Sequence, residues 1–408
     1  MKQKLVSLQN TQPDNQITKS PNHHHLKTIN NNIYFIIIAI GISLFTSCGD
    51  EPKPKQIEVK ITNHYSDSQV KRVSKKIDAI FSRAKKQHDF NGSILVAKRG
   101  QVLINNEYGY ADFKKKTLID SSSSFQLASV SKQFTAIAIL MLYEQHKLDL
   151  EDKITKYFSG FPYPEITIKQ CLSHTSGLPK YFWLVEHKWE EDYPPSNEEV
   201  MEMIEDYELP LFFSSGKKYV YSNTNYLVLA SIIEEITGDS YADFLQDNIF
   251  EPLGMSNSFV YSFGKDAEKP NQLWGYRIYK YRYHIKIPAT INDGVVGDKN
   301  VFSTAKDLNK WVNGLNSGKL ISKELLKEAY SQAKTSKGRE IEYGYGFHIK
   351  YKDGIKKVYH NGKWNGFRTS ITQYPSDSLT IIFLEHSSYQ SISSLINATK
   401  RAVDEELR

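Results

Sequence analysis

The sequence predicts an α+β fold in which an antiparallel sheet is flanked by terminal helices and carries a helical lobe inserted in the middle. Three observations support this prediction. A helix and a hairpin begin the folded part, helical patterns dominate from about residue 129 to 311, and strands followed by a helix end the chain. A sheet built from both ends of the chain accounts for this order.

The composition is that of a globular protein. The 408 residues are 40% hydrophobic and 24% charged, which is enough for one large or two modest cores. The formal net charge is +6, but residues 1–47 contribute four lysines and one aspartate, so the remainder carries only +3. Because the lysines of that remainder are scattered among acidic residues, the sequence argues against a nucleic-acid partner.

The chain begins with a segment that is typical of a signal peptide. Residues 33–45 read IYFIIIAIGISLF and are preceded by Lys27. This stretch suits the apolar region of a signal peptide and is short for a helix that spans a bilayer. We therefore expect residues 1–47 to be a signal peptide with a long polar N-terminal region, with a single anchor helix as the alternative.

The residues after this segment indicate a lipid anchor. Phe45-Thr46-Ser47-Cys48 resembles a bacterial lipobox, in which the cysteine becomes lipidated and N-terminal. Residues 48–73 then form the expected polar tether, and a plain signal peptide without lipidation is the alternative. The second cysteine, Cys171, is predicted to be a small buried side chain. These features place the protein in the bacterial cell envelope, as a lipoprotein facing the periplasm or the cell surface.

The folded domain is expected to span residues 74–408. An amphipathic helix is predicted from Ser74 to about Asp89, and a β-hairpin follows with its turn at Arg99-Gly100. In the middle, Ser196 begins a capped helix and Gly238 ends another. Strands are predicted over residues 343–352, 356–360, 367–374 and 379–385, and a closing helix over residues 391–406.

Ser129 and Lys132 form an S-x-x-K motif that could supply a nucleophile and its base. The motif alone is weak, because it also occurs at Ser68, Ser214, Ser262, Ser303 and Ser331. Ser129 differs because a strongly apolar helix, Phe134 to Leu142, follows it and should hold its first turn rigidly. Lysine acts as a base only when burial or a second cation lowers its pKa. The alternative is that Ser129 only caps a core helix.

Two further motifs could complete such a site. Tyr221-Ser222-Asn223 precedes an apolar helix and would supply a phenol that carries protons and an amide that orients Lys132 or the substrate. His360-Asn361-Gly362 follows a predicted strand, where the glycine would let a substrate lie against the backbone. The backbone N–H groups of Lys363 and Ser129 could then stabilise an oxyanion. Each motif alone is more often structural.

The ordered set S-x-x-K, Y-x-N and H-x-G resembles serine β-lactamases and penicillin-binding proteins of the class C type. The resemblance spans about residues 75–405. It includes Leu172 to Leu178, which is similar to an L-x-H-T-S-G-L segment of that family, and Tyr343 to Phe347, which is similar to its Y-G-x-G-[FW] segment. The resemblance implies a β-lactamase/transpeptidase-like fold, and it gives His174 no catalytic role.

The resemblance also implies the roles of the site residues. Ser129 would form an acyl-enzyme, Lys132 and Tyr221 would share the acid and base work, and Asn223 would orient them or the substrate. His360, Gly362 and Lys363 would contact the substrate. No metal and no organic cofactor is implied, and the partner would be a small-molecule or peptide acyl substrate. The membrane would be reached through Cys48.

The third motif departs from the K-[ST]-G of true β-lactamases and transpeptidases. A neutral histidine at position 360 and an amide at position 361 replace a permanent ammonium and a hydroxyl, so recognition of a substrate carboxylate should be weaker. H-x-G occurs in relatives that resemble esterases and D-amino-acid peptidases, which favours an ester or peptide hydrolase. The alternative is a catalytically silent protein of the same fold that binds a cell-wall peptide or a partner.

Overall fold

The structure is a computed structural model that describes residues 65–280, 283–389 and 392–407. The predicted signal peptide and the predicted lipidated Cys48 lie outside these residues. The described part confirms the α+β class, with a six-stranded antiparallel sheet in the order β10-β11-β12-β13-β1-β2. No helix of the described residues is long and apolar enough to cross a bilayer.

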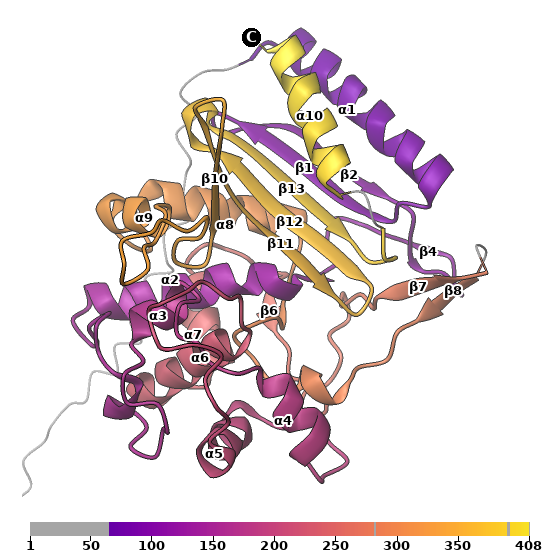
Figure 1. The fold of residues 1–408 in the computed structure, drawn as a ribbon. Helices are drawn as coiled ribbons and strands as arrows, with labels where there is room; N and C mark the ends of the chain where they lie inside the picture. The colour runs from indigo at the N-terminus through magenta and orange to yellow at the C-terminus, as the bar shows by residue number, and fades with distance from the viewer. Residues whose placement is uncertain (1–64, 281–282, 390–391, 408) are drawn as a thin grey trace, which may run out of the picture. The chain divides into compact units, whose positions relative to one another are not determined.

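The sheet is built from both ends of the chain, as the sequence predicts (Figure 1). Its N-terminal hairpin pairs with the last strand, so that Gly92 lies opposite Glu385 and Lys98 opposite Leu379. The strands are β1 (Gly92–Lys98), β2 (Gln101–Tyr108), β10 (His348–Lys352), β11 (Ile355–Trp364), β12 (Phe367–Tyr374) and β13 (Leu379–Glu385).

The two terminal helices, α1 (Asp67–His88) and α10 (Ile392–Glu406), lie side by side on one face of this sheet (Figure 1). Phe81 of α1 packs there against Phe90, Tyr108 and Phe383. Helix α1 begins earlier than the predicted Ser74, because Ser66 caps it and exchanges two hydrogen bonds with Gln69. The tether expected to reach residue 73 therefore ends before this helix.

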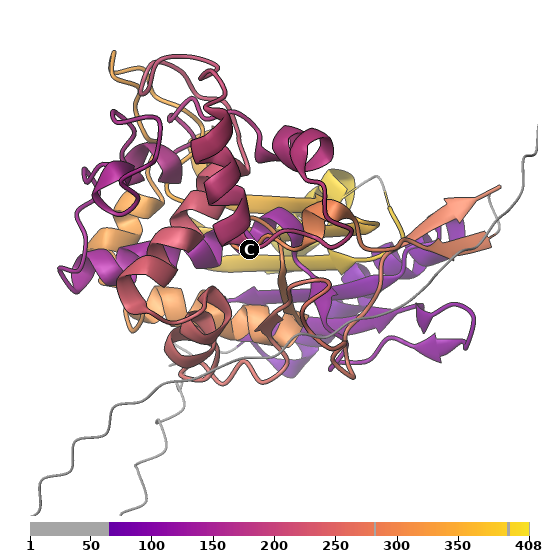
Figure 2. The same ribbon diagram turned by 90° about the horizontal axis from the view of Figure 1, so that it is seen from below.

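The other face of the sheet is covered by α8 (Ala305–Ser317), which packs on β1 and β13. The inserted lobe therefore ends before α8, whereas the sequence placed its end near residue 311. The lobe's helices lie to one side of the sheet in both views (Figures 1 and 2). They are α2 (Ser131–Glu144), α3 (Ile168–Leu172), α4 (Tyr181–Lys188), α5 (Asn197–Tyr207), α6 (Thr224–Thr237) and α7 (Tyr241–Leu245).

The helix signals within the lobe are confirmed. Ser196 caps α5 through a capping box with Glu199. Gly238 ends α6 in the left-handed conformation, with φ 75°. A π-helical turn, η3 (Gln246–Phe250), follows α7, and α9 (Lys323–Ala329) follows α8. The free Cys171 is buried in α3, as predicted.

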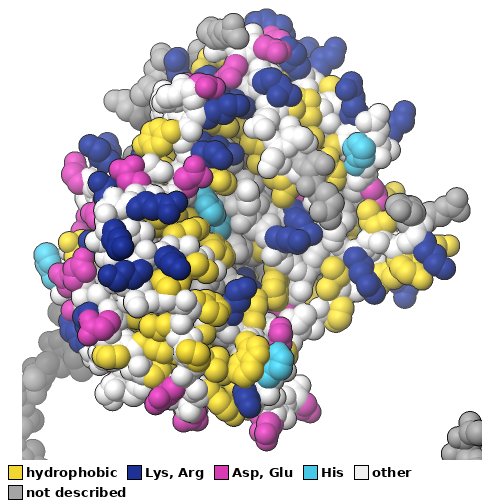
Figure 3. All heavy atoms as spheres, in the orientation of Figure 1, with side chains coloured by type: hydrophobic (Ala, Val, Ile, Leu, Met, Phe, Trp, Pro, Cys, Tyr) yellow, Lys and Arg dark blue, Asp and Glu magenta, His cyan; other side chains and the backbone are white. Residues whose placement is uncertain are grey.

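Short strands join the lobe to the sheet. Strands β5 (Phe125–Gln126), β9 (Val301–Ser303) and β6 (Phe259–Val260) form a three-stranded sheet next to the turn that carries Ser129. Two hairpins complete the fold, β3 (Tyr110–Asp112) with β4 (Thr117–Leu118), and β7 (Tyr276–Tyr279) with β8 (Tyr283–Lys286). The visible face of the molecule intersperses basic, acidic and apolar side chains (Figure 3).

Two strand predictions near the site differ from the structure. Only His348–Lys352 of the predicted strand 343–352 is extended, because Tyr343 to Phe347 turns and presses on α2. A side chain at Gly346, with φ 84°, would lie 2.6 Å from the Cβ of Ala136. Strand β11 does not end at His360 but continues to Trp364, because β12 pairs with its whole second half.

We predict that Phe81→Ala lowers the free energy of unfolding by about 3–5 kcal/mol, because the ring fills the core between the terminal helices and the sheet. Chemical denaturation monitored by circular dichroism measures this loss. Lys76→Ala is the matched control on the same helix, because Lys76 only forms exposed ion pairs with Glu405 and Glu406. An equal effect of the two variants would contradict the assignment of Phe81 to the core.

Candidate active site

Ser129 lies in a short 3-10 turn, η1 (Ala128–Val130), that leads directly into α2. Residues 131–142 of α2 are all buried, so the turn stands on a rigid base. The turn is also fixed from the side of the small sheet, since the Leu127 N–H donates to the Val301 carbonyl at 2.8 Å. Ala128 has φ 51°, which is an unfavourable conformation for a residue with a Cβ. Ser129 is partly exposed at the end of this arrangement.

Strand β11 lies directly against this turn at Gly362. A Cβ at Gly362 would stand 2.2 Å from the Leu127 carbonyl oxygen and 2.2 Å from Thr369 Oγ1. Thr369 Oγ1 in turn donates to the same Leu127 oxygen at 2.6 Å. Only glycine therefore allows β11 to approach the turn that carries Ser129 this closely.

The second half of β11 has one free edge. Strand β10 pairs with β11 only from Ile355 to Tyr359, whereas β12 pairs with it as far as Trp364. Within the described residues, the edge from His360 to Trp364 therefore has no strand partner on the β10 side. Its backbone groups, including those of Lys363, are available to an extended substrate.

Lys132 places its amine next to Ser129 inside the core. Lys132 Nζ donates to Ser129 Oγ at 3.2 Å and to the Asp298 carbonyl at 2.7 Å. Its amine stands 5.1 Å from the centre of the Tyr221 ring and 5.6 Å from that of Tyr226. Burial lowers the pKa of Lys132 to about 7; Asp298 opposes this decrease and Lys299 adds to it. Close to neutral pH, a large fraction of this amine is unprotonated and able to accept a proton.

This contact separates Ser129 from the other serines of the S-x-x-K pattern. The hydroxyls of three of them are bonded away from their lysines: Ser262 to the Gly294 carbonyl, Ser303 to Ser258 and Ser331 to the Lys327 carbonyl. At Ser129, by contrast, the hydroxyl and the lysine amine of the motif are in contact.

Tyr221 joins the pair from the loop before α6. Its hydroxyl is buried and has no hydrogen-bond partner among the described residues. Burial raises the pKa of Tyr221 well above its usual value, and the neighbouring Ser129 hydroxyl acts in the opposite direction. Tyr221 is therefore a neutral phenol. Asn223 occupies the N-cap of α6, and its Oδ1 is also buried without a partner in the described structure.

His174 contacts this loop through hydrogen bonds and ring packing, as expected of a structural residue. Its Nδ1 accepts from the Ser222 N–H at 3.3 Å and from Asn225 Nδ2 at 3.0 Å. Its ring lies 4.2 Å from the Tyr221 ring, centre to centre. Burial lowers the pKa of His174 well below its usual value, so that its ring is neutral.

The His360 ring lies 6.2 Å from the Tyr221 ring, centre to centre, and its contact with a substrate stays a prediction. Its side chain is 1% exposed, and both ring nitrogens have protein partners. Nδ1 donates to the Asn361 carbonyl at 2.9 Å, so Nε2 accepts from the Tyr343 hydroxyl at 3.1 Å. Burial lowers the pKa of His360 well below its usual value. The side chain of His360 therefore supports β11 as a neutral group.

Aromatic side chains near the site divide into two groups. The Phe182 and Trp364 rings are neighbours at 5.5 Å, and the Trp364 indole is fixed by the buried Asp293. Tyr181 lies buried beneath them, whereas Trp183 is 43% exposed and stacks on His187. Phe182 and Trp364 thus form one apolar surface, to which Trp183 does not belong.

A pair of residues that the sequence analysis did not single out lies next to Lys132. Asp298 and Lys299 are both buried and form an ion pair of 3.0 Å. The absence of any recognisable motif around them explains why they were missed. The relation of Asp298 and Lys299 to the site is visible only in the fold, which places them beside Lys132.

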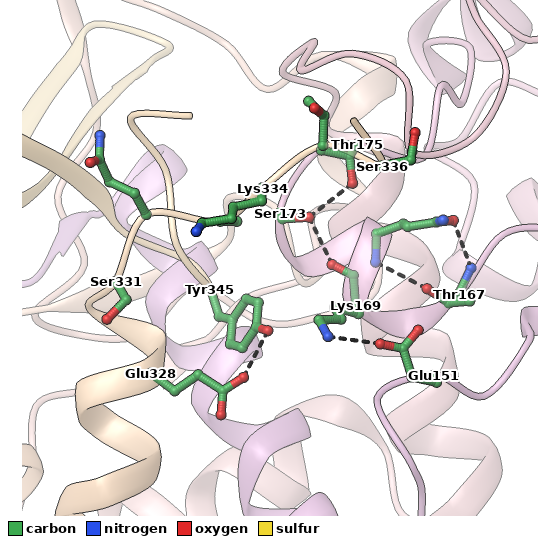
Figure 4. Close-up of a pocket in the computed structure, with 15 residues that line it drawn as sticks. Glu151, Thr167, Lys169, Ser173, Thr175, Glu328, Ser331, Lys334, Ser336 and Tyr345 are labelled. Carbon is green, nitrogen blue, oxygen red and sulfur yellow. Dashed lines mark hydrogen bonds and ion pairs between the residues drawn. The ribbon is translucent and has the colours of Figure 1, made fainter. Parts of the chain in front are cut away.

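A separate polar cavity of about 450 Å³ lies elsewhere in the protein (Figure 4). It contains an ion pair of 2.7 Å between Lys169 and Glu151 and a hydrogen bond of 3.0 Å from Tyr345 to Glu328. Its lining includes no sequence-predicted site residue. In the part of the chain that the structure describes, no group of three or more histidine, cysteine, aspartate or glutamate side chains is placed to bind a metal.

We predict that Gly362→Ala slows covalent labelling of Ser129 by a serine-directed fluorophosphonate about 100-fold. The added Cβ would push β11 or the turn that carries Ser129 out of position, and small misplacements of reacting groups greatly slow a reaction. Intact-mass spectrometry over time measures the rate. Gly338→Ala is the control, because an added Cβ at Gly338 meets nothing within 4 Å; the φ of 77° there disfavours a side chain but lies far from a close contact of this kind. Unchanged labelling of a folded Gly362→Ala would contradict the close approach.

Comparison with known proteins agrees with this geometry. Residues 77–402 match the protein family described as Beta-lactamase. Penicillin-binding protein 4* of Bacillus subtilis (strain 168) is 33% identical over 322 residues, which cover 76% of this chain and 71% of that protein. A teichoic acid D-alanine hydrolase of Staphylococcus aureus (strain NCTC 8325 / PS 47) is 28% identical over 327 residues, which cover 77% of each chain.

A solved structure shows the same architecture. The octameric penicillin-binding protein homologue from Pyrococcus abyssi superposes with a TM-score of 0.69 at 26% identity, over 81% of this chain and 77% of that one. The sequence match, the shared fold and the ordered motifs agree with one another. The chain belongs to the β-lactamase family, close to penicillin-binding proteins and the hydrolases related to them.

Proposed function

We propose that the protein is a serine hydrolase that forms an acyl-enzyme at Ser129 and cleaves an ester or amide of a cell-wall-type D-peptide or small ester. The observation that carries this proposal is the 3.2 Å contact between the buried Lys132 amine and the accessible Ser129 hydroxyl. Membership of the β-lactamase family supports it, as does similarity to a protein that is a teichoic acid D-alanine hydrolase.

In the proposed acylation, Ser129 Oγ attacks the substrate carbonyl and transfers its proton to Lys132 Nζ. Lys132 suits the role of base better than Tyr221, because its pKa is lowered to about 7 whereas that of the phenol is raised by burial. The oxyanion forms between the backbone N–H groups of Ser129 and Lys363. The proton then passes from Lys132 to the leaving group, either directly or through the Tyr221 hydroxyl.

Deacylation reverses these proton transfers. A water molecule gives a proton to Lys132 as it attacks the acyl carbon, and the proton returns to Ser129 Oγ when the acid leaves. Asn223 carries a buried amide oxygen without a partner, which suits a role in orienting the substrate or the water. Each cycle consumes one water molecule and restores the neutral amine.

The polarity of β11 favours an ester or peptide hydrolase over an enzyme of β-lactam resistance. His360 is neutral and buried, and pleating points Asn361 and Lys363 to the opposite face from Gly362. The strand therefore presents no cationic side chain at the place where a substrate carboxylate would be held. Recognition instead relies on backbone groups and on the aromatic wall of Phe182 and Trp364.

We predict that wild-type protein gains the mass of a fluorophosphonate adduct and hydrolyses p-nitrophenyl acetate, whereas Ser129→Ala does neither, because the nucleophile is removed. Intact-mass spectrometry and absorbance at the nitrophenolate band measure the two effects. Ser303→Ala is the control, because Ser303 also has a lysine three residues later but is buried against Ser258. Labelling that persists in Ser129→Ala would exclude this nucleophile. A folded wild type that reacts with no reagent would instead favour the silent binding protein.

We also propose that Cys48 is lipidated and anchors the protein in the bacterial cell envelope, facing the periplasm or the surface. Cys48→Ala is expected to move the protein from the detergent phase to the aqueous phase in detergent partitioning, since a thioether-linked lipid supplies the membrane affinity. Cys171→Ala is the control, because Cys171 is buried in α3. Detergent partitioning that Cys48→Ala leaves unchanged would show that another segment anchors the chain.

A further inference from the structure

The buried ion pair of Asp298 and Lys299 is closed by a tyrosine. Lys299 Nζ donates to Asp298 Oδ1 at 3.0 Å and to the Tyr181 hydroxyl at 2.6 Å, and that hydroxyl donates to Asp298 Oδ2 at 3.1 Å. Asp298 is 0% and Lys299 2% exposed. Each charged group is thus neutralised inside the protein, which is the condition under which a buried charge is tolerated.

The backbone of the same segment is bonded to α2. Three consecutive carbonyls accept from α2 side chains: that of Gly297 from Thr135 Oγ1 at 2.6 Å, that of Asp298 from Lys132 Nζ at 2.7 Å, and that of Lys299 from Ser131 Oγ at 2.8 Å. The peptide that carries the ion pair is therefore the peptide that positions the Lys132 amine.

The other ionisable groups that face Lys132 are neutral. Burial raises the pKa of two tyrosines, Tyr221 and Tyr226, so that their phenols are neutral. Burial lowers the pKa of three histidines, His174, His348 and His360, so that their rings are neutral. The charges next to Lys132, within the described residues, are then those of Asp298 and Lys299. These two act on it in opposite directions.

We propose that Lys299 is a positioning residue of the active site, which acts by neutralising the Asp298 carboxylate beside Lys132 and by holding the peptide whose carbonyl orients the Lys132 amine. Without Lys299, an unpaired buried carboxylate would favour the protonated ammonium and remove the base. With Lys299 present, its charge offsets that of Asp298, and burial keeps the pKa of Lys132 low. This inference rests on the proposed role of Lys132 as the base for Ser129.

Lys299 lies apart from β11, where the third motif is. The strand has a neutral histidine at position 360, so it provides no second cation near the Lys132 amine. Lys299 provides one from the loop before β9, beneath the aromatic wall, with its amine 5.4 Å from the centre of the Trp364 ring. The cation beside Lys132 therefore lies on this loop, where it is paired with Asp298 and Tyr181.

The test is the pH dependence of kcat/KM for p-nitrophenyl acetate between pH 5.5 and 9, with the full chain in detergent and with Ser129→Ala as the blank. We expect the wild-type rate to fall as the pH drops through about 7, where Lys132 becomes protonated. Lys299→Met should move this acid limb up by about one pH unit, which lowers the rate about fivefold at pH 7 and leaves it nearly unchanged at pH 9. A purely structural loss would lower the rate equally at every pH.

Three matched variants isolate the charge. Asp298→Asn should move the acid limb down, the double variant Asp298→Asn/Lys299→Met should return it close to wild type, and Lys299→Arg should keep it there. If Lys299→Met does not fold, the double variant and Asp298→Asn still test the inference. The double variant should fold, because it leaves no unpaired buried charge. An acid limb that stays in place in a folded Lys299→Met, or that Asp298→Asn leaves in place, would overturn the inference.

The outcome also separates this inference from the proposed function. A wild type that hydrolyses the ester with an acid limb that none of these variants moves would leave the proposed function intact and refute the role of Lys299. A wild type that shows no turnover above the Ser129→Ala blank at any pH would refute the proposed function, and the role of Lys299 with it.

Discussion

Burial of the Lys132 amine is the constraint on which the site depends. Burying an unpaired ammonium group away from water costs free energy, so burial lowers the pKa of a lysine and favours its neutral amine. The surroundings of Lys132 follow from this. Helix α2 is enclosed on all sides, the nearby histidines and tyrosines are held neutral, and the adjacent carboxylate of Asp298 is neutralised by Lys299.

The second requirement is that segments far apart in the sequence meet at Ser129. The turn that carries Ser129 is bonded to β9 through Leu127 and to β12 through Thr369, and β11 lies against it at Gly362. Strand β12 is itself held in the sheet by β13, which pairs with the N-terminal hairpin. The site is therefore complete only when the two ends of the chain have formed one sheet, because its three motifs lie on three separate segments.

The same arrangement bears on what the site can recognise. A free strand edge from His360 to Trp364 offers backbone hydrogen bonds to an extended substrate, and the neighbouring aromatic rings offer an apolar surface. The buried cations are occupied by protein partners, so they influence the proton transfers more than the binding of an anion. This distribution of charge agrees with an ester or amide substrate whose affinity does not depend on a carboxylate, and it fits a chain related to both penicillin-binding proteins and a D-alanine hydrolase.

Much of the fold followed from local signals in the sequence. The terminal helix, the first hairpin, the strands 367–374 and 379–385, the cap at Ser196 and the stop at Gly238 all depend on hydrophobic periodicity or on backbone chemistry within a few residues. The three motifs of the site were likewise visible as ordered residue patterns, and the apolar run after Ser129 distinguished it from the other serines with a lysine three positions on.

The tertiary structure alone decided how those residues act. It showed that the His360 side chain is buried, that β11 continues to Trp364, and that Tyr343 to Phe347 turns against α2 instead of extending a strand. It also brought Asp298 and Lys299 next to Lys132, some 166 residues away along the chain. Periodicity reports which side of an element is buried, whereas desolvation and charge pairing depend on what the fold places on that side. The sequence determined the family and the candidate nucleophile, because both depend on ordered motifs, and the packing determined the protonation states.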